Sequence, residues 1–282
     1  MQLGSLTLRT ISGGTYWIDG GTMFGVVPRP LWERNFPTDE QHRIPQDTNC
    51  LLVQAGDRNI LIDTGAGSKL TDKERARLSA QPGDPLVENL AAAGLAVEDI
   101  DQVVLTHLHF DHAGGATRFD DEGQLVPTFP NAEYVVQRDE WVSATAGYPE
   151  LRAAYSLDNL LPLQDSGQLT LIDGNRAIGS DMRVFVTGGH TQGHQVIILD
   201  SDDQTAVYVA DICPTWRHLP VLWCLSYDTH LLQTRRIKAE LLGQIADRGW
   251  LALFDHDPDV VAARLQRDSR KDFVVSESLE SL

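Results

Sequence analysis

The chain has 282 residues, of which 42% are hydrophobic and 7% aromatic, an ordinary composition for a globular protein with a sizeable core. Forty acidic residues against 23 basic ones give a net charge of −17. That charge repels phosphate backbones, so we expect no nucleic-acid partner.

Three cysteines, Cys50, Cys213 and Cys224, are spaced in a way that indicates neither a disulfide framework nor a thiolate zinc site. The first ten residues lack the basic start and apolar block of a secretion signal. No apolar run is long enough to cross a bilayer. We therefore expect a cytoplasmic protein with no membrane partner.

Strands and turns are predicted for the first 65 residues. Segments 51–55 and 59–63, separated by a Gly-Asp pair, are typical of a β-hairpin. Helical periodicity follows over 71–80 and again over 85–93. Later strand candidates are 102–105, 133–137, 182–187, 195–200, 205–210 and 250–254.

One further helix is predicted between the last two strands. Its apolar stripe comprises Ile237, Leu241 and Ile245, and Asp228 or Thr229 is its expected N-cap. Two turn-rich segments, 115–131 and 143–168, are interpreted as surface loops. No linker rich in proline or glycine divides the chain, so we expect a single α/β domain over residues 1–282.

The run Thr-His-Leu-His-Phe-Asp-His-Ala-Gly-Gly, at residues 106–115, directly follows a predicted strand. Alternate residues of an extended segment point the same way, so His107, His109 and Asp111 are expected on one side. His112 would turn in from the following turn. Imidazole nitrogen and carboxylate oxygen are preferred zinc ligands, so the run favours a metal site over a polar loop that happens to be rich in histidine.

Further candidate ligands again follow apolar strands. His190 and His194 come after the strand near 182–187, Asp211 after the strand near 205–210, and His256 after the last strand. Taken alone, Asp211 or His256 is more often a capping or solvated residue. Their shared position at strand ends, where α/β folds gather their chemistry, favours one metal site.

Taken in order, these motifs resemble those of the metallo-β-lactamase fold hydrolases, and the resemblance covers nearly the whole chain. The matching runs are Leu61-Ile62-Asp63-Thr64-Gly65, the His-x-His-x-Asp-His block, Gly189-His190-Thr191, Ala210-Asp211 and Phe254-Asp255-His256-Asp257. The resemblance implies an α/β fold in which two mixed β-sheets, flanked by helices, form a four-layer αββα sandwich.

The resemblance also implies two zinc ions, although iron, manganese or cobalt can occupy such nitrogen- and oxygen-rich sites. The implied ligands are His107, His109 and His190 for one ion, Asp111, His112 and His256 for the other, and Asp211 as a bridge between them. Asp63 resembles the family's buried carboxylate that orients a ligand histidine, a role compatible with its alternative as a turn cap. His194 is assigned a supporting role behind the ligands.

The detailed pattern looks most like the quorum-quenching lactonases that open N-acyl homoserine lactones. A metal-bridging hydroxide is the expected nucleophile, with Asp211 and Asp111 as catalytic residues and Asp111 returning a proton to the leaving oxygen. One departure is Pro214, which stands where some lactonases place a tyrosine. Tyr227 is a candidate to polarise the carbonyl instead.

An aromatic loop after Asp211 either packs as core or forms the wall of a substrate pocket. The pocket candidates are Trp216, Leu219, Leu222, Trp223, Tyr227 and Phe24. His218 is interpreted as a solvated loop residue. We expect a small-molecule substrate with an apolar portion, and exposed apolar loops also suit a homodimer, which similar proteins often form.

Three alternatives stay open. The first is an organophosphate hydrolase or aryl esterase, which shares the mechanism. The second is a thioesterase of the glyoxalase II type, which would want a basic cluster for the glutathione carboxylates, and no convincing one is visible near the motifs. The third is a metal-binding scaffold without turnover, against which the complete ligand set argues.

Overall fold

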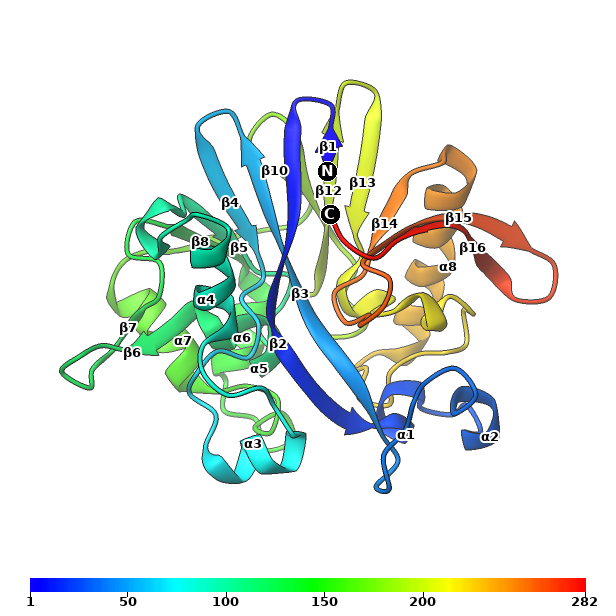
Figure 1. Cartoon of the computed structure of the whole chain (residues 1–282), viewed down its shortest axis with the longest axis horizontal. Coiled ribbons are helices and arrows are strands. Elements are labelled where there is room, and N and C mark those ends of the chain that lie inside the picture. The colour runs from blue at the N-terminus through cyan, green and yellow to red at the C-terminus, as the bar shows by residue number, and fades with distance from the viewer. The chain divides into compact units, whose positions relative to one another are not determined.

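The computed structural model describes all 282 residues, which form two compact units. Unit 1 comprises Met1–Thr15 and Thr48–Gly174, and unit 2 comprises Tyr16–Asp47 and Asn175–Leu282. Two seven-stranded mixed sheets flanked by helices account for most of the chain (Figure 1). The predicted fold class, an α/β fold with two mixed sheets flanked by helices, is therefore confirmed.

The first sheet has the strand order β1-β2-β3-β4-β5-β8-β9. Its strands are β1 (Gln2–Leu3), β2 (Leu6–Asp19), β3 (Arg43–Ala55), β4 (Arg58–Ile62), β5 (Gln102–Val104), β8 (Glu133–Gln137) and β9 (Leu169–Ile172). The unit boundary falls within β2 and within β3. The predicted hairpin is confirmed as β3 and β4, while β4, β5, β8 and β9 run parallel to one another.

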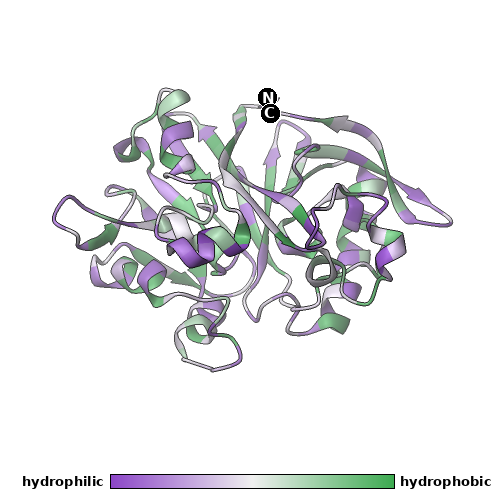
Figure 2. Cartoon of the chain, turned by 60° about the horizontal axis from the view of Figure 1, so that its bottom comes forward, coloured by the Kyte–Doolittle hydropathy of each residue, from purple (hydrophilic) through white to green (hydrophobic).

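The helices of unit 1 are α3 (Asp72–Leu78), α4 (Pro85–Ala92), α5 (Phe110–Ala113), α6 (Arg138–Thr145) and α7 (Leu157–Asp165), with short 3-10 turns η1 (Val97–Asp99) and η2 (Gly114–Ala116). Apolar side chains of α4, α6 and α7 pack against this sheet. The predicted helices at 71–80 and 85–93 are confirmed as α3 and α4. Leu86, Leu90 and Leu160 join sheet residues in one buried apolar cluster. Helices in Figure 2 carry hydrophilic and hydrophobic residues side by side, as such one-sided packing requires.

The second sheet lies in unit 2, and its strands follow one another in chain order from β10 to β16. Its strands are β10 (Arg176–Ala177), β11 (Met182–Val186), β12 (Gln195–Ser201), β13 (Gln204–Tyr208), β14 (Leu251–Leu253), β15 (Ala262–Asp268) and β16 (Asp272–Leu279). Only β13 and β14 among its paired strands run parallel, because α8 (Leu231–Arg248) lies between them in the chain.

Unit 2 also contains α1 (Gly20–Phe24), α2 (Arg29–Trp32) and the 3-10 turns η3 (Ala210–Ile212) and η4 (Trp216–His218). The predicted stripe residues Leu241 and Ile245 of α8 are buried against the second sheet. The predicted N-cap of this helix is wrong: the cap is His230, one residue after Thr229. The polar side chains of Asp228 and Thr229 bind the loop around His190 instead.

Two segments interpreted as surface loops contain regular structure. Segment 115–131 includes the hairpin of β6 (Thr117–Phe119) and β7 (Leu125–Pro127), and segment 143–168 includes α7. Both elements are short, and α7 contains Pro162. Their hydrophobic periodicity was therefore too weak to predict a hairpin or a helix. None of the helices is long and apolar enough to span a bilayer.

Candidate metal centre

The histidine-rich motif of unit 1 begins where β5 leaves the sheet. His107 and His109 lie in a loop, and α5 begins at Phe110. The expectation of one extended segment is therefore wrong for Asp111, which lies with His112 in a single helical turn. The backbone turns here because Thr64 donates its amide and hydroxyl hydrogens to the carbonyl of His112. All four candidate ligands of the motif are buried.

Asp63 holds the motif from behind. Its carboxylate accepts hydrogen bonds from the amide of Thr106 at 2.8 Å and from the Thr106 hydroxyl at 2.8 Å. It also accepts one from Nδ1 of His112 at 2.9 Å. With the Nδ1 proton committed to Asp63, Nε2 of His112 is the nitrogen that could bind a metal, and it lies 3.9 Å from Oδ1 of Asp111.

His107 and His109 bring two ring nitrogens together. Nε2 of His107 lies 3.1 Å from Nδ1 of His109, and Nδ1 of His107 lies 3.1 Å from the Thr106 hydroxyl oxygen. Because Thr106 donates its proton to Asp63, its oxygen accepts from Nδ1 of His107. Nε2 of His107 then presents a lone pair toward His109, an arrangement that a shared proton or a bound cation stabilises.

Glu140 is a supporting residue that the sequence did not reveal. Its fully buried carboxylate accepts hydrogen bonds from the amide of Leu108 at 3.0 Å and from the hydroxyl of Tyr155 at 3.1 Å. The Tyr155 ring in turn lies 5.1 Å from the His109 ring. Glu140 thus fixes the loop between the two histidines. Glu140 lies on α6 next to other polar residues, so the sequence did not distinguish it from an ordinary surface residue.

In unit 2, candidate ligands follow three strands of the second sheet. His190 follows β11 through Gly188 and Gly189, whose φ angles of +55° and +82° favour glycine. Asp211 follows β13 and His256 follows β14, and these neighbouring strands are parallel. Their following residues therefore leave the sheet at the same edge, as the sequence predicted.

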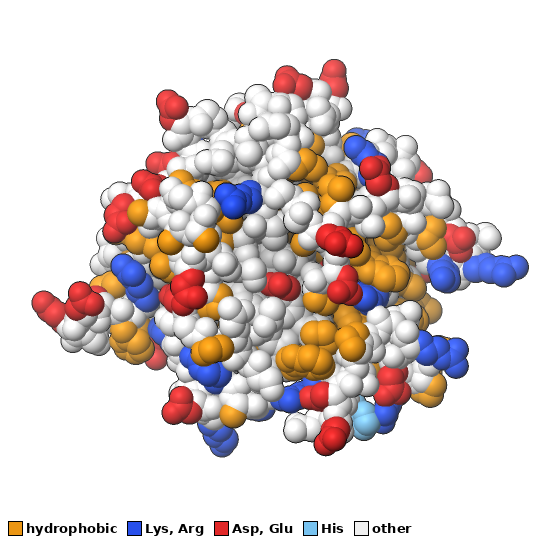
Figure 3. Space-filling model, viewed as in Figure 1, with side chains coloured by type: hydrophobic (Ala, Val, Ile, Leu, Met, Phe, Trp, Pro, Cys, Tyr) orange, Lys and Arg blue, Asp and Glu red, His pale blue; other side chains and the backbone are white.

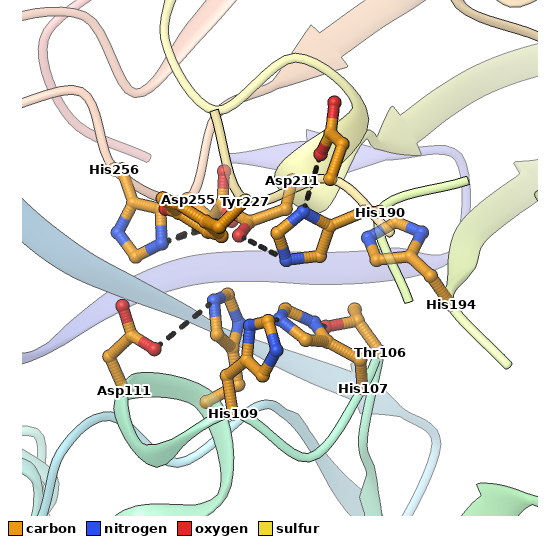
Figure 4. A network of polar contacts seen from close by, with 12 residues as sticks. Thr106, His107, His109, Asp111, His190, His194, Asp211, Tyr227, Asp255 and His256 are labelled. Carbon is orange, nitrogen blue, oxygen red and sulfur yellow. Dashed lines mark hydrogen bonds and ion pairs between the residues drawn. The ribbon is translucent and has the colours of Figure 1, made fainter. Parts of the chain in front are cut away.

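His190 lies between two carboxylates (Figure 4). Its Nε2 is 2.9 Å from Oδ2 of Asp211, and its Nδ1 donates to Oδ1 of Asp228 at 2.8 Å. Burial lowers the pKa of His190, but Asp211 and then Asp228 raise it more, to a net value of about 10. The surroundings of this ring thus strongly favour positive charge. Asp228 was predicted only as a helix cap, so its role behind His190 was missed.

His256 is oriented by backbone. Its Nδ1 lies 2.8 Å from the carbonyl oxygen of Asp47, which only accepts, so Nδ1 is the donor. Its Nε2 lies 3.3 Å from Oδ1 of Asp211 and 3.6 Å from Oδ2 of Asp255. The ligand atoms of Asp211, Asp255 and His256 all lie within 4.8 Å of one another.

His194, predicted to support the ligands, has its ring centroid 5.5 Å from that of His190, at an edge-to-face angle of 79°. Nδ1 of His194 lies 2.6 Å from the hydroxyl oxygen of Thr187. The same Thr187 hydroxyl also donates to the backbone carbonyl of His194. These contacts fix the ring beside His190.

The donor set of unit 2 fits a divalent metal. Two imidazoles and three carboxylates, those of His190, His256, Asp211, Asp228 and Asp255, are buried together. Burying several carboxylates costs free energy unless positive charge accompanies them. In unit 1, Nε2 of His112 is likewise presented by a buried carboxylate. Nitrogen and oxygen donors oriented from behind are the usual surroundings of zinc and similar ions.

The predicted substrate-pocket residues have different surroundings. Phe24 and Leu219 are buried in the core, Leu222 is exposed, and the remaining three, Trp216, Trp223 and Tyr227, are half-buried. The Tyr227 ring lies 5.5 Å from that of His190, while its hydroxyl donates to the sulfur of Met23. Tyr227 is therefore a pocket candidate that lies beside a candidate ligand.

His218 was predicted to be solvated, and this is wrong. Its ring is fully buried and stacks on Phe24 with centroids 4.4 Å apart. Nε2 donates to the carbonyl of Met23 at 3.0 Å, and Nδ1 lies 2.8 Å from the Thr215 hydroxyl. Both ring nitrogens are satisfied inside the core, which explains why burial is tolerated.

A cavity of about 310 Å³ in unit 1 was not anticipated from the sequence. Phe110 and Tyr155 form part of its lining, and both adjoin the histidine-rich motif. Its charged lining residues are Lys69, Glu74, Arg77, Arg152 and Asp158. The cavity therefore combines apolar and charged surfaces.

Comparisons with known proteins agree with this geometry. The family model described as the metallo-beta-lactamase superfamily matches residues 43–267. An N-acyl homoserine lactonase of Bacillus cereus is 26% identical over 163 residues, which are 54% of this chain and 58% of that protein. The chain thus matches somewhat more than half the length of this curated relative. A probable metallo-hydrolase of Bacillus subtilis is 39% identical over 96 residues, 34% of this chain and 26% of that protein.

Solved structures give the same fold over almost the whole chain. A probable metal-dependent hydrolase from Staphylococcus aureus matches with a TM-score of 0.89 and 32% identity, covering 99% of this chain and 100% of that one. A dizinc quorum-quenching lactonase in complex with a product matches with a TM-score of 0.81 and 23% identity, covering 99% and 97%.

Proposed function

The chain belongs to the metallo-beta-lactamase superfamily of metal-dependent hydrolases, and from that premise we propose that it hydrolyses lactones or related esters with two divalent metal ions. The observation that carries the proposal is the shared orientation of His112, His190 and His256. Each is bound through Nδ1 to an acceptor behind it, so that Nε2 is left for a metal. Zinc is the proposed metal because imidazole predominates among the donors.

We propose the following ligand assignment, supported by the family match, which spans all of the residues concerned. One ion would be held by His107, His109 and His190, the other by Asp111, His112 and His256, and Asp211 would be a ligand of both. The two units would then act as one functional domain.

In this proposal, some residues position the ligand histidines and another transfers a proton. Asp63 and Asp228 hold His112 and His190 in the tautomer that presents Nε2, and Glu140 holds the loop before α5. When bound, the two ions would polarise the carbonyl oxygen and make hydroxide available near neutral pH. We assign to Asp111, which keeps slight solvent exposure, the transfer of a proton from the attacking hydroxide to the leaving alkoxide. Burial raises the pKa of the Cys213 thiol to about 12, so Cys213 is unsuited to act as a nucleophile.

We propose that the cavity of unit 1 binds the acyl chain of the substrate, the part that differs from one lactone to another. Phe110, Leu70 and Leu78 offer apolar surface to such a chain, and exposed Arg77 and Arg152 offer cations to a polar end group. The proposed substrate is thus a small molecule with an apolar portion.

Among the alternatives, an organophosphate or aryl esterase activity shares the proposed chemistry and is tested with it. A thioesterase of the glyoxalase II type gains some support from the cationic lining of the cavity, although Glu74 and Asp158 partly offset that charge. The complete set of proposed ligands argues against a metal-binding scaffold without turnover.

The test is a hydrolysis panel on metal-loaded protein. It comprises N-acyl homoserine lactones of several chain lengths, aryl esters, a paraoxon-type phosphotriester, a glutathione thioester and a β-lactam. We expect lactones to give the highest kcat/KM, and Asp211→Asn to reduce it at least 100-fold. Turnover of β-lactams or thioesters alone would contradict the lactonase proposal, and no turnover of any substrate would favour the scaffold.

A further inference from the structure

We propose that Asp255 is an additional metal ligand, which gives the ion bound by His256 and Asp211 a further carboxylate. Asp255 and His256 belong to one sequence motif, in which the family resemblance implies a role for His256 alone. The inference rests on the proposed function in one respect alone, that a metal is bound by this group. All three residues lie in unit 2 and are buried.

The distances among the three side chains fit coordination of one ion. Nε2 of His256 lies 3.3 Å from Oδ1 of Asp211 and 3.6 Å from Oδ2 of Asp255. The ligand atoms of all three residues lie within 4.8 Å of one another. Ligands held about 2.1 Å from a single ion lie about 3.0 Å apart in octahedral geometry and about 3.4 Å apart in tetrahedral geometry. A small inward adjustment therefore brings Asp255 into the ion's coordination sphere.

The tautomer of His256 supports the proposal that Asp255 is a metal ligand. Its Nδ1 donates to the carbonyl of Asp47, so in the neutral ring Nε2 carries a lone pair. That lone pair faces one oxygen from each of two buried carboxylates (Figure 4). Three electron-rich atoms converge where water is excluded, an arrangement that a cation among them stabilises.

The backbone fixes Asp255 in this position. Tyr208 and Leu253 are register partners in the parallel pair of β13 and β14, and Asp211 and Asp255 follow them within three residues. The amide of Phe254 donates to Val261 at 2.9 Å, which holds the residue immediately before Asp255. Rigid strand ends on both sides thus aim the two carboxylates at the same imidazole.

A further carboxylate changes which metal the group prefers. Three carboxylates with two imidazoles form a harder donor set than two carboxylates with two imidazoles. Oxygen donors suit Mn²⁺, whereas imidazole suits Zn²⁺. Asp255 should therefore contribute more to the affinity for Mn²⁺ than to the affinity for Zn²⁺.

The experiment titrates metal-free full-length protein with Zn²⁺ and with Mn²⁺ in a calorimeter. The variant is Asp255→Asn, and the matched control is Asp200→Asn, which alters an exposed carboxylate of unit 2 paired with Arg183. We expect Asp255→Asn to raise the Kd of one bound ion at least tenfold, with the larger loss for Mn²⁺. Unchanged Kd values and stoichiometry for both metals would overturn the proposal.

Thermal unfolding separates a ligand from a structural residue. Without metal, Asp255→Asn removes a buried negative charge close to that of Asp211, so the variant should unfold at a higher temperature than the wild type. With saturating metal the order should reverse. A variant that is less stable than the wild type without metal, or that does not fold, would overturn the ligand role.

These outcomes are distinct from a failure of the proposed function. If the wild type binds no divalent metal, the proposed function fails with the inference. If the wild type binds metal and hydrolyses lactones while Asp255→Asn binds both metals normally, only the inference fails.

Discussion

At the scale of single residues, the chemistry depends on which nitrogen of each histidine is available. His112 donates Nδ1–H to Asp63, His190 to Asp228 and His256 to the carbonyl of Asp47. The acceptors differ, but each leaves Nε2 for a ligand role. The family resemblance already implied Asp63 behind a ligand histidine, whereas Asp228 and the Asp47 carbonyl, which lie 38 and 209 residues from their histidines, were not recognisable from the sequence.

Asp228 provides a test at this scale. Replacement by Asn should leave the fold intact but weaken the orientation of His190, because an amide accepts a weaker hydrogen bond than a carboxylate. We expect a 10- to 100-fold loss of metal affinity, the usual effect of losing such a residue. Metal titration of Asp228→Asn beside Asp247→Asn, an exposed carboxylate paired with Arg267, measures it. Equal affinities in the two variants would refute the role of Asp228.

At the scale of elements, strand ends carry the candidate ligands, and a buried aromatic cluster supports one of their loops. Phe24, Trp32 and Phe36 form this cluster. The ring of His218 stacks on that of Phe24. Arg217 ties the same loop to Asp257 and Asp259 and lies over the ring of Phe36. The part of the loop that contains His218 and Leu219 is thus core, whereas Leu222 is exposed and stays a candidate for a pocket wall.

His218 makes the cluster sensitive to acid. Burial, and secondly the charge of Lys238, lower its pKa from 6.5 to about 3. Below pH 6.5 the unfolded chain therefore binds a proton that the folded chain refuses until about pH 3. The free energy of unfolding should fall on this account by about 1.4 kcal/mol per pH unit below pH 6.5.

Urea unfolding of the wild type and His218→Gln between pH 7.5 and 4.5 measures this contribution. The variant has no group that titrates at this position, so its stability should fall less steeply with acid than that of the wild type. The difference between the two should shrink as pH falls. Parallel curves would show that His218 takes up its proton in the folded chain as easily as in the unfolded one.

At the scale of the whole molecule, acidic side chains are spread over the face seen in Figure 3, with basic ones among them. They contribute to the net charge of −17, which supports solubility but adds self-repulsion. Buried carboxylates at the candidate centre add to that cost. Bound cations should therefore matter for stability as well as for catalysis.

Removal of metal should lower the melting temperature reversibly. At a free metal concentration 1,000 times the Kd, one bound ion stabilises the folded state by about 4 kcal/mol. We expect dialysis against a chelator to lower Tm and to abolish hydrolysis, and added Zn²⁺ to restore both. Calorimetry and an activity assay on the same sample measure them. An unchanged Tm in chelator would contradict a metal centre in the folded chain.

The sequence by itself determined the fold class, the β3–β4 hairpin, α3 and α4, and the order of the ligand motifs. These features rest on local periodicity and on short motifs whose residues are neighbours in the chain. It could not determine the helical turn at Asp111, the buried state of His218, or the roles of Asp228 and Glu140. Each of these depends on partners brought close by folding, since a hydrogen bond or burial across dozens of residues leaves no pattern in either segment alone.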